Sequence, residues 1–132
     1  MIGMWSAYSQ QYMLAFAGIT TLAFALPIFF TPVAWARHMR WTIPEHTDLA
    51  VYFGRCLGAL IIVAEVFALR AALTGSGLVA AFEIMTAIVI LMIPVHIYGA
   101  FRRIQPITET LEIGLWCALL VLNLSFFPMA GA

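Results

Sequence analysis

Four long apolar runs, separated by short links, constrain this chain more than any other feature. They cover residues 12–30, 49–73, 78–100 and 107–127. A helix needs about 20 mostly apolar residues to cross a hydrocarbon core about 30 Å thick. The runs therefore predict an all-α integral membrane bundle of four transmembrane helices, with residues 1–132 forming one four-helix domain.

The composition also indicates that this chain is embedded in a lipid bilayer, which is its solvent and its first expected partner. Only 9% of the residues are charged and 64% are hydrophobic, whereas soluble domains carry roughly 25% charged residues. The formal net charge is zero, so no basic patch predicts nucleic-acid binding. Cys56 and Cys117 lie in apolar runs without metal or redox spacing, and we expect them to be small buried residues.

The links between the runs differ in character. Residues 33–41 follow Thr31-Pro32 and mix aromatic with basic side chains, which predicts either a short interfacial helix or an ordinary aromatic-belt loop. Residues 42–48 are polar. Residues 74–77 (TGSG) form a turn so short that the second and third runs must be antiparallel neighbours.

The arginines predict the orientation in the membrane. Arg37, Arg40, Arg102 and Arg103 fall in the first and third links, and only Arg70 lies near the second. Short loops rich in Arg stay in the cytoplasm. We therefore expect a multi-pass protein of the bacterial inner (plasma) membrane with both termini periplasmic or extracellular.

Gly54 and Gly58 lie one turn apart near the start of the second run. Such a pair leaves a groove in which another helix can approach closely, because small residues are what bring helices together in lipid. The groove is expected to pack either within the chain or against another subunit.

Several ionisable residues lie inside the runs, where each costs about 2.5 to 3.5 kcal/mol at the bilayer centre and therefore calls for a partner or a use. Arg55, His96, Glu109 and Glu112 should all lie within about two turns of the cytoplasmic boundary. With Trp116, which shares a face of the fourth run with both glutamates, they form the candidate polar cluster or ligand-binding site. Arg55 is the expected counter-ion of one glutamate.

Two interpretations of this cluster stay open. Glu109 and Glu112 occupy the first turns of a helix, where the helix dipole favours negative charge, so they can be structural residues paired with nearby arginines. Alternatively, His96 and the glutamates handle protons or bind a metal ion. No pair has a diagnostic spacing, so the sequence predicts no metal and no cofactor. It leaves the catalytic residues unknown and leaves open whether the protein is an enzyme.

A second intramembrane polar layer is expected near the outer boundary. Glu65 and Glu83 should lie at a similar depth, and Arg70 is just over one turn from Glu65. We expect Arg70 to pair with one of these carboxylates while its guanidinium reaches toward the headgroups.

One segment resembles a known class of membrane proteins. Residues 52–60 (YFGRCLGAL), preceded by Phe30-Thr31-Pro32 and Trp35, are similar to small bacterial four-helix proteins of the DoxX-like and related uncharacterised type. The resemblance implies the four-helix layout and an accessory role beside quinone-linked oxidoreductases. It carries over no catalytic residue.

Two function hypotheses follow. The first is an accessory or scaffold subunit of a larger membrane complex, working with other membrane subunits or as a homo-oligomer. The alternative is a membrane-embedded enzyme or binder of a lipophilic small molecule such as a quinone, isoprenoid or sterol-like lipid, held by the polar cluster at the cytoplasmic end. A small multidrug exporter is less favoured, because such proteins use an acidic residue in the first span and this chain has none there.

Overall fold

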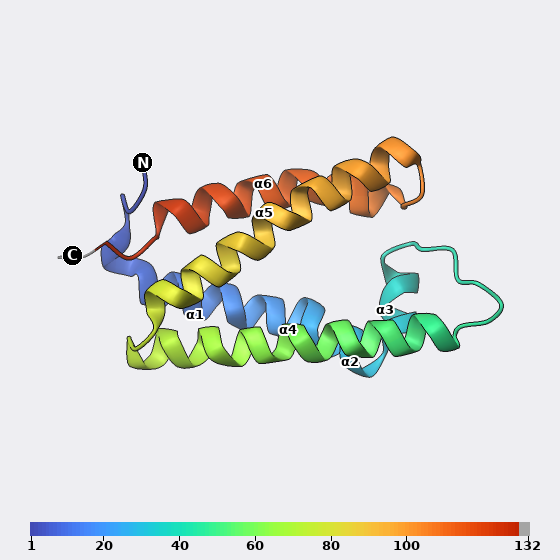
Figure 1. Ribbon diagram of the computed structural model, residues 1–132, viewed down its shortest axis with the longest axis horizontal. Helices are drawn as coiled ribbons and strands as arrows, with labels where there is room; N and C mark the ends of the chain where they lie inside the picture. The colour runs from blue at the N-terminus through green and yellow to red at the C-terminus, as the bar shows by residue number, and fades with distance from the viewer. Residues whose placement is uncertain (130–132) are drawn as a thin grey trace.

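The computed structural model describes residues 1–129, and this part of the chain is all-α (Figure 1). Four helices are long and apolar enough to span a membrane: Ser6–Phe30, Asp48–Thr74, Leu78–Arg102 and Ile107–Ser125. The prediction of four spans is therefore confirmed, with ends that differ by a few residues. The last three spans are α4 (Asp48–Thr74), α5 (Leu78–Arg102) and α6 (Ile107–Ser125).

The first span is built from several pieces. A short 3-10 turn, η1 (Ser6–Tyr8), leads into α1 (Ser9–Thr20), a wide π-type turn η2 (Thr21–Ala25) and α2 (Leu26–Phe30). Pro27 has no N–H to offer the carbonyl of Ala23, and the indole of Trp35 donates to that carbonyl instead, at 3.2 Å. Trp35 lies on α3 (Pro32–His38), so this bond ties α3 back onto the span. Of the two alternatives for residues 33–41, the structure has the short helix over most of the segment.

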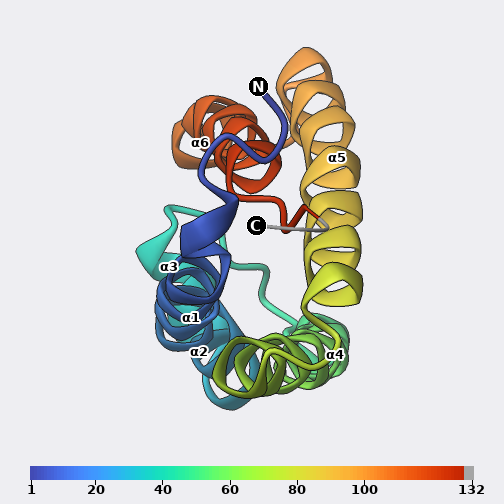
Figure 2. The same cartoon turned by 90° about the vertical axis from the view of Figure 1, so that its left-hand side faces the viewer.

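The helices form two layers that meet at one end and diverge toward the other. α1, α2 and α4 make one layer and α5 with α6 the other (Figures 1 and 2). The buried core at the narrow end consists mainly of alanines, which let α1, α4 and α5 approach closely, as small residues do in membranes. Its members are Met13, Ala17, Ala68, Ala71, Ala72, Ala81, Phe82 and Met85.

The N-terminal segment fastens α1 to the end of α6. The Tyr12 hydroxyl donates to Oδ1 of Asn123 at 2.6 Å, and the Ser9 hydroxyl donates to the carbonyl of Phe126 at 2.6 Å. The backbone N–H of Gly3 donates to the Leu124 carbonyl at 2.9 Å. The narrow end is thus closed both by packing and by hydrogen bonds.

The wide end carries α3, residues 39–47 and the α5–α6 turn, whereas the N-terminus, the end of α6 and the α4–α5 turn lie at the narrow end (Figure 1). The arginine-rich first and third links therefore share one end of the molecule. Cys56 and Cys117 are exposed on the outer surface, so the expectation that they are buried is wrong.

Gly58 and Gly54 pack within the chain, against the end of the first span and the start of α3. A Cβ added at Gly58 would lie 2.6 Å from the backbone nitrogen of Phe29, and one at Gly54 would lie 2.6 Å from Cβ of Pro32. The glycine groove predicted on α4 is therefore occupied by the chain's own backbone.

We predict that Gly58→Ala destabilises the protein, because its methyl group meets backbone atoms that cannot swing aside. Overpacking of this kind costs about 1 to 3 kcal/mol. Gly114→Ala is the matched control, since a Cβ there meets nothing within 4 Å. Thermal unfolding in the same detergent should show a lower midpoint for Gly58→Ala and an unchanged or higher one for Gly114→Ala. Equal midpoints for Gly58→Ala and wild type would contradict the close contact.

Candidate functional site

A large cavity lies between the two layers in the wide half of the molecule. Its volume is about 900 Å³, and its walls come from α1, α2, α3, residues 41–47, α4, α5 and α6. Most of the lining is apolar. The alanine core ends this space at the narrow end, where Met85 belongs to both. The cavity is thus a consequence of tight packing at one end and divergence at the other.

His96 is the centre of the polar part of the cavity wall. Its side chain is 4% exposed, and its Nε2 lies 3.2 Å from Oε2 of Glu109 and 3.4 Å from Oε2 of Glu112. Its Nδ1 lies 2.8 Å from the carbonyl oxygen of Met92. A carbonyl can only accept, so Nδ1 carries the proton in this contact. In the neutral ring Nε2 then has a free lone pair, toward which the indole of Trp116 donates at 3.3 Å.

The α5–α6 turn sets the position of His96 relative to the two glutamates. α5 ends where Arg103 adopts a left-handed conformation with φ 54°. The amide of Gln105 then donates to the His96 carbonyl at 3.0 Å and to the Thr110 hydroxyl at 3.1 Å. Gln105 therefore connects the last turns of α5 to the first turn of α6.

On α6 the spacing of the polar residues has the predicted effect. Glu109, Glu112 and Trp116 recur at i, i+3 and i+7 and all line the cavity. Farther along the same face, Asn123 is fully buried and accepts the hydrogen bond from Tyr12. The bundle-facing side of α6 thus carries the site at one end and a structural hydrogen bond at the other.

The segment after α3 completes the site, and this role was not predicted. The indole N–H of Trp41 donates to Oε1 of Glu109 at 2.8 Å, and the Thr108 hydroxyl donates to the Met39 carbonyl. These bonds hold residues 39–47 against the start of α6. Trp41 lies among basic residues in a link between two spans. Aromatic side chains are common there simply because they favour the membrane boundary. No local signal therefore marked Trp41 as a partner of Glu109.

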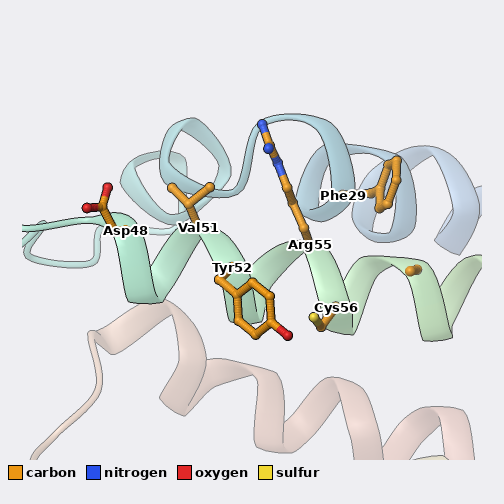
Figure 3. Close-up of a pocket in the computed structure, with 7 residues that line it drawn as sticks. Phe29, Asp48, Val51, Tyr52, Arg55 and Cys56 are labelled. Atoms are coloured by element: carbon orange, nitrogen blue, oxygen red, sulfur yellow. The ribbon is translucent and has the colours of Figure 1, made fainter.

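Arg55 does not join the cluster. It is exposed and lines another pocket with Phe29, Asp48 and Tyr52 (Figure 3), and no ion pair connects it to Glu109 or Glu112. The sequence predicted how deep Arg55 lies along α4, but not which way its side chain points around the helix. At about 100° per residue, Arg55 points about 120° away from Ile61, which faces the cavity.

The glutamates also form no ion pair with Arg102 or Arg103 within residues 1–129. The expectation of a purely structural arginine pairing is therefore wrong for both carboxylates. The α5–α6 turn directs the two arginines outward, where both are exposed, while the glutamates face His96. The charge of the two carboxylates is not balanced by any guanidinium in the described chain.

The second polar layer is not a connected group. Glu65 is 4% exposed and accepts a 2.6 Å hydrogen bond from the Thr20 hydroxyl, whereas Arg70 and Glu83 are exposed and form no ion pair among the described residues. Arg70 lies about 140° around α4 from Glu65, so it cannot face the same neighbours. Glu65 instead lines the cavity, and its Oε2 has no hydrogen-bond partner within residues 1–129.

The cavity communicates with the outer surface of the spans. Leu57 and Leu60 on α4 line the cavity and yet are 53% and 71% exposed, and Ile88 on α5 is 39% exposed. These residues belong to two spans that meet closely only at the narrow end. The cavity therefore has an apolar side opening between α4 and α5.

No family model, curated protein or solved structure matches this chain. The four-span membrane architecture rests on the helices themselves, and the resemblance of residues 52–60 to DoxX-like proteins stays a prediction. The function must accordingly be argued from the cavity and its polar wall.

We predict that Trp41→Phe loosens residues 39–47, because it removes the N–H donor to Glu109 and keeps most of the ring. Loss of a hydrogen bond of this kind costs about 1 to 2 kcal/mol, or roughly 5- to 30-fold in a local opening equilibrium. Hydrogen exchange of the peptide covering residues 39–47 measures that opening. Tyr12→Phe, which removes a hydrogen bond at the narrow end, should leave exchange of this peptide unchanged. Equal exchange in Trp41→Phe and wild type would mean that the contact does not hold the segment.

Proposed function

We propose that this protein binds a lipophilic molecule in its interior cavity, with the polar head of the molecule at His96, Glu109, Glu112 and Trp116. The observation that carries this proposal is the combination of a cavity of about 900 Å³, walls that are mostly apolar, and one concentrated polar group on its lining. Small-molecule sites have this composition, with apolar walls and a few convergent polar groups that fix orientation, in volumes of about 300 to 1,000 Å³.

The side opening supports entry from the membrane. A lipophilic molecule dissolved in the bilayer would meet the exposed edges of Leu57, Leu60 and Ile88 first. It can then move inward without crossing water, so its apolar part stays in an apolar environment along the whole path. The polar head is the only part that gains new partners on entry.

The balance of donors and acceptors favours a head that donates hydrogen bonds. The cluster has four carboxylate oxygens, of which Oε1 of Glu109 already accepts from Trp41. Its neutral donors are the indoles of Trp41 and Trp116. Buried acceptors without donors are costly, so a hydroxyl fits this surplus better than a bare carbonyl. A quinol, an isoprenoid alcohol or a sterol-like lipid has this chemistry.

Glu65 supports a second polar contact along the cavity. Its Oε2 is buried and has no partner in the described chain, although Oε1 accepts from Thr20. A carboxyl oxygen in an apolar environment calls for a donor. A ligand with a second oxygen or hydroxyl along its length would satisfy it.

The accessory-subunit hypothesis is less well supported than ligand binding. Exposed apolar side chains lie on all four spans. Contact with lipid is enough to explain them, so they do not indicate a partner subunit. The glycine groove on α4, which offered a surface for another subunit, is already occupied by Phe29 and Pro32. Ligand binding, by contrast, accounts for the cavity and for its polar wall together.

We predict that a lipophilic molecule copurifies with the protein and that filling the cavity expels it. The double variant Leu57→Trp/Ile61→Trp places two large side chains on the cavity wall of α4. The molecule is measured by solvent extraction and mass spectrometry of protein taken gently from its membranes. Its amount per chain should fall several-fold in this variant.

The matched control is Val63→Trp/Val66→Trp on the same helix. Both valines are exposed, at 68% and 60%, and lie outside the cavity lining. The control should retain the molecule at the wild-type level. If no molecule copurifies with the wild type, or if both double variants lose it equally, ligand binding in the cavity is contradicted.

We also propose that the wide end, which carries the arginine-rich links, faces the cytoplasm. Arg37, Arg40, Arg102 and Arg103 all belong to this end, and Arg-rich short loops remain cytoplasmic. A C-terminal alkaline phosphatase fusion expressed in bacteria should therefore be active, and a C-terminal green fluorescent protein fusion dark. The opposite pair of signals would place the polar cluster near the outer boundary.

A further inference from the structure

Three potential metal ligands converge at the polar wall of the cavity. One ligand atom from each of His96, Glu109 and Glu112 lies within 4.8 Å of the other two. Nε2 of His96 is 3.2 Å from one carboxylate and 3.4 Å from the other, and the side chains are 4%, 11% and 12% exposed. The sequence placed these residues in one polar cluster by their depth, but it could not give the distances between their ligand atoms, because His96 lies on α5 and both glutamates lie on α6.

The atoms that meet there are mainly acceptors. Because Nδ1 of His96 donates to the Met92 carbonyl, the neutral ring presents a lone pair at Nε2 to two carboxylates. Trp116 supplies one N–H to that lone pair. No arginine forms an ion pair with either glutamate within residues 1–129. Two ionised carboxylates would therefore place two negative charges in a poorly hydrated site, and such charge must be compensated.

We propose that His96, Glu109 and Glu112 form a binding site for a divalent transition-metal ion. The charge of such an ion equals that of the two carboxylates, so the site becomes neutral on binding. The ion replaces the missing donors with one centre that all three acceptors can share. This proposal rests on the proposed function and deepens it, because all three residues line the cavity, so an ion held by them would also be within reach of the oxygen of the ligand's head.

The distances fit this assignment. Nitrogen and oxygen ligands at about 2.1 Å from one ion lie about 3.0 to 3.5 Å apart in octahedral or tetrahedral geometry. The separations of 3.2 and 3.4 Å from Nε2 fall in this range. An ion at this centre would take the Nε2 lone pair in place of the Trp116 N–H, which lies 3.3 Å from Nε2.

The surrounding groups orient the ligands as metal sites require. Metal-bound histidines usually donate their other N–H to a carbonyl or carboxylate, and Nδ1 of His96 does so to Met92. Trp41 similarly holds Oε1 of Glu109, which leaves Oε2 directed toward His96. One imidazole and two carboxylates without a thiolate suit Mn²⁺, Fe²⁺ or Zn²⁺.

A further buried acceptor lines the same cavity. Glu65 is 4% exposed, and its Oε2 has no partner among residues 1–129. It belongs to the facing layer, on α4. The cavity thus presents acidic oxygen from both layers, and the Oε2 atom of Glu65 lacks a partner among the described residues, which favours a cationic or donating occupant over an acceptor.

The test is metal stoichiometry of the full-length protein in lipid nanodiscs, with any affinity tag removed. Protein stripped with a chelator is equilibrated with Mn²⁺, Zn²⁺ or, without oxygen, Fe²⁺, then freed of unbound metal and analysed by mass spectrometry for elements. We expect one ion per chain for at least one of these metals. With Mn²⁺, the electron paramagnetic resonance signal of the free ion should fall as the site fills.

His96→Gln, Glu109→Gln and Glu112→Gln should each weaken metal affinity at least 10-fold. His46→Gln is the matched control, because His46 is an exposed histidine in the link at the same end of the molecule. It should bind like wild type. Since Glu112→Gln also removes a buried charge, it should fold normally, so loss of binding in that variant cannot be ascribed to unfolding.

Fewer than about 0.2 ions per wild-type chain for all three metals would overturn the metal site, as would equal binding by wild type and Glu112→Gln. The two proposals fail separately. If the stripped protein still retains its lipophilic molecule but binds no metal, only the metal site is wrong. If metal binds with one ion per chain and no lipophilic molecule copurifies, the metal site stands and the proposed function fails.

Discussion

The close approach of three helices at one end is the constraint on which the rest of this structure depends. Ala68, Ala71 and Ala72 on α4 let α1 and α5 come near, and the hydrogen bonds of Tyr12 and Ser9 to the end of α6 close the same region. In lipid, helices gain little from burying apolar surface, so close packing and hydrogen bonds must hold them together. Toward the other end the two layers diverge around the cavity (Figure 1). The cavity follows from this difference between the two ends.

A second constraint is that polar groups in the spans must find partners where water is scarce. Pro27 leaves a carbonyl without its helical donor, and Trp35 supplies one from α3. Gln105 holds the α5–α6 turn, and Trp41 holds Glu109. These contacts bring α3 and residues 39–47 to the wide end and give the polar wall its shape. Among residues 1–129, Oε2 of Glu65 remains without a hydrogen-bond partner, and Glu65 lines the cavity, so a donating ligand gains a partner there.

Much of the fold could be predicted from the sequence, because long apolar runs, short links and proline positions are local signals. The grouping of His96 with Glu109, Glu112 and Trp116 was also accessible, since depth and the i, i+3, i+7 spacing place them together. Arg55 was misplaced because depth alone does not say which way a side chain points around its helix. Trp41 and Gln105 were missed because their roles depend on how a link folds back onto α6. The metal-ligand geometry likewise exists only between helices, and sequence spacing could not reveal it.

The most direct test of the central claim is an experimental structure of the protein in nanodiscs formed from its own membranes, with a bound antibody fragment to add mass for electron microscopy. We predict elongated density between α4 and the α5–α6 layer, with one end within hydrogen-bonding or coordination distance of Glu109 and Glu112. Layers that close on each other with no space between them would contradict it. So would a cavity that contains no density while His96 and the two glutamates are satisfied entirely by protein groups.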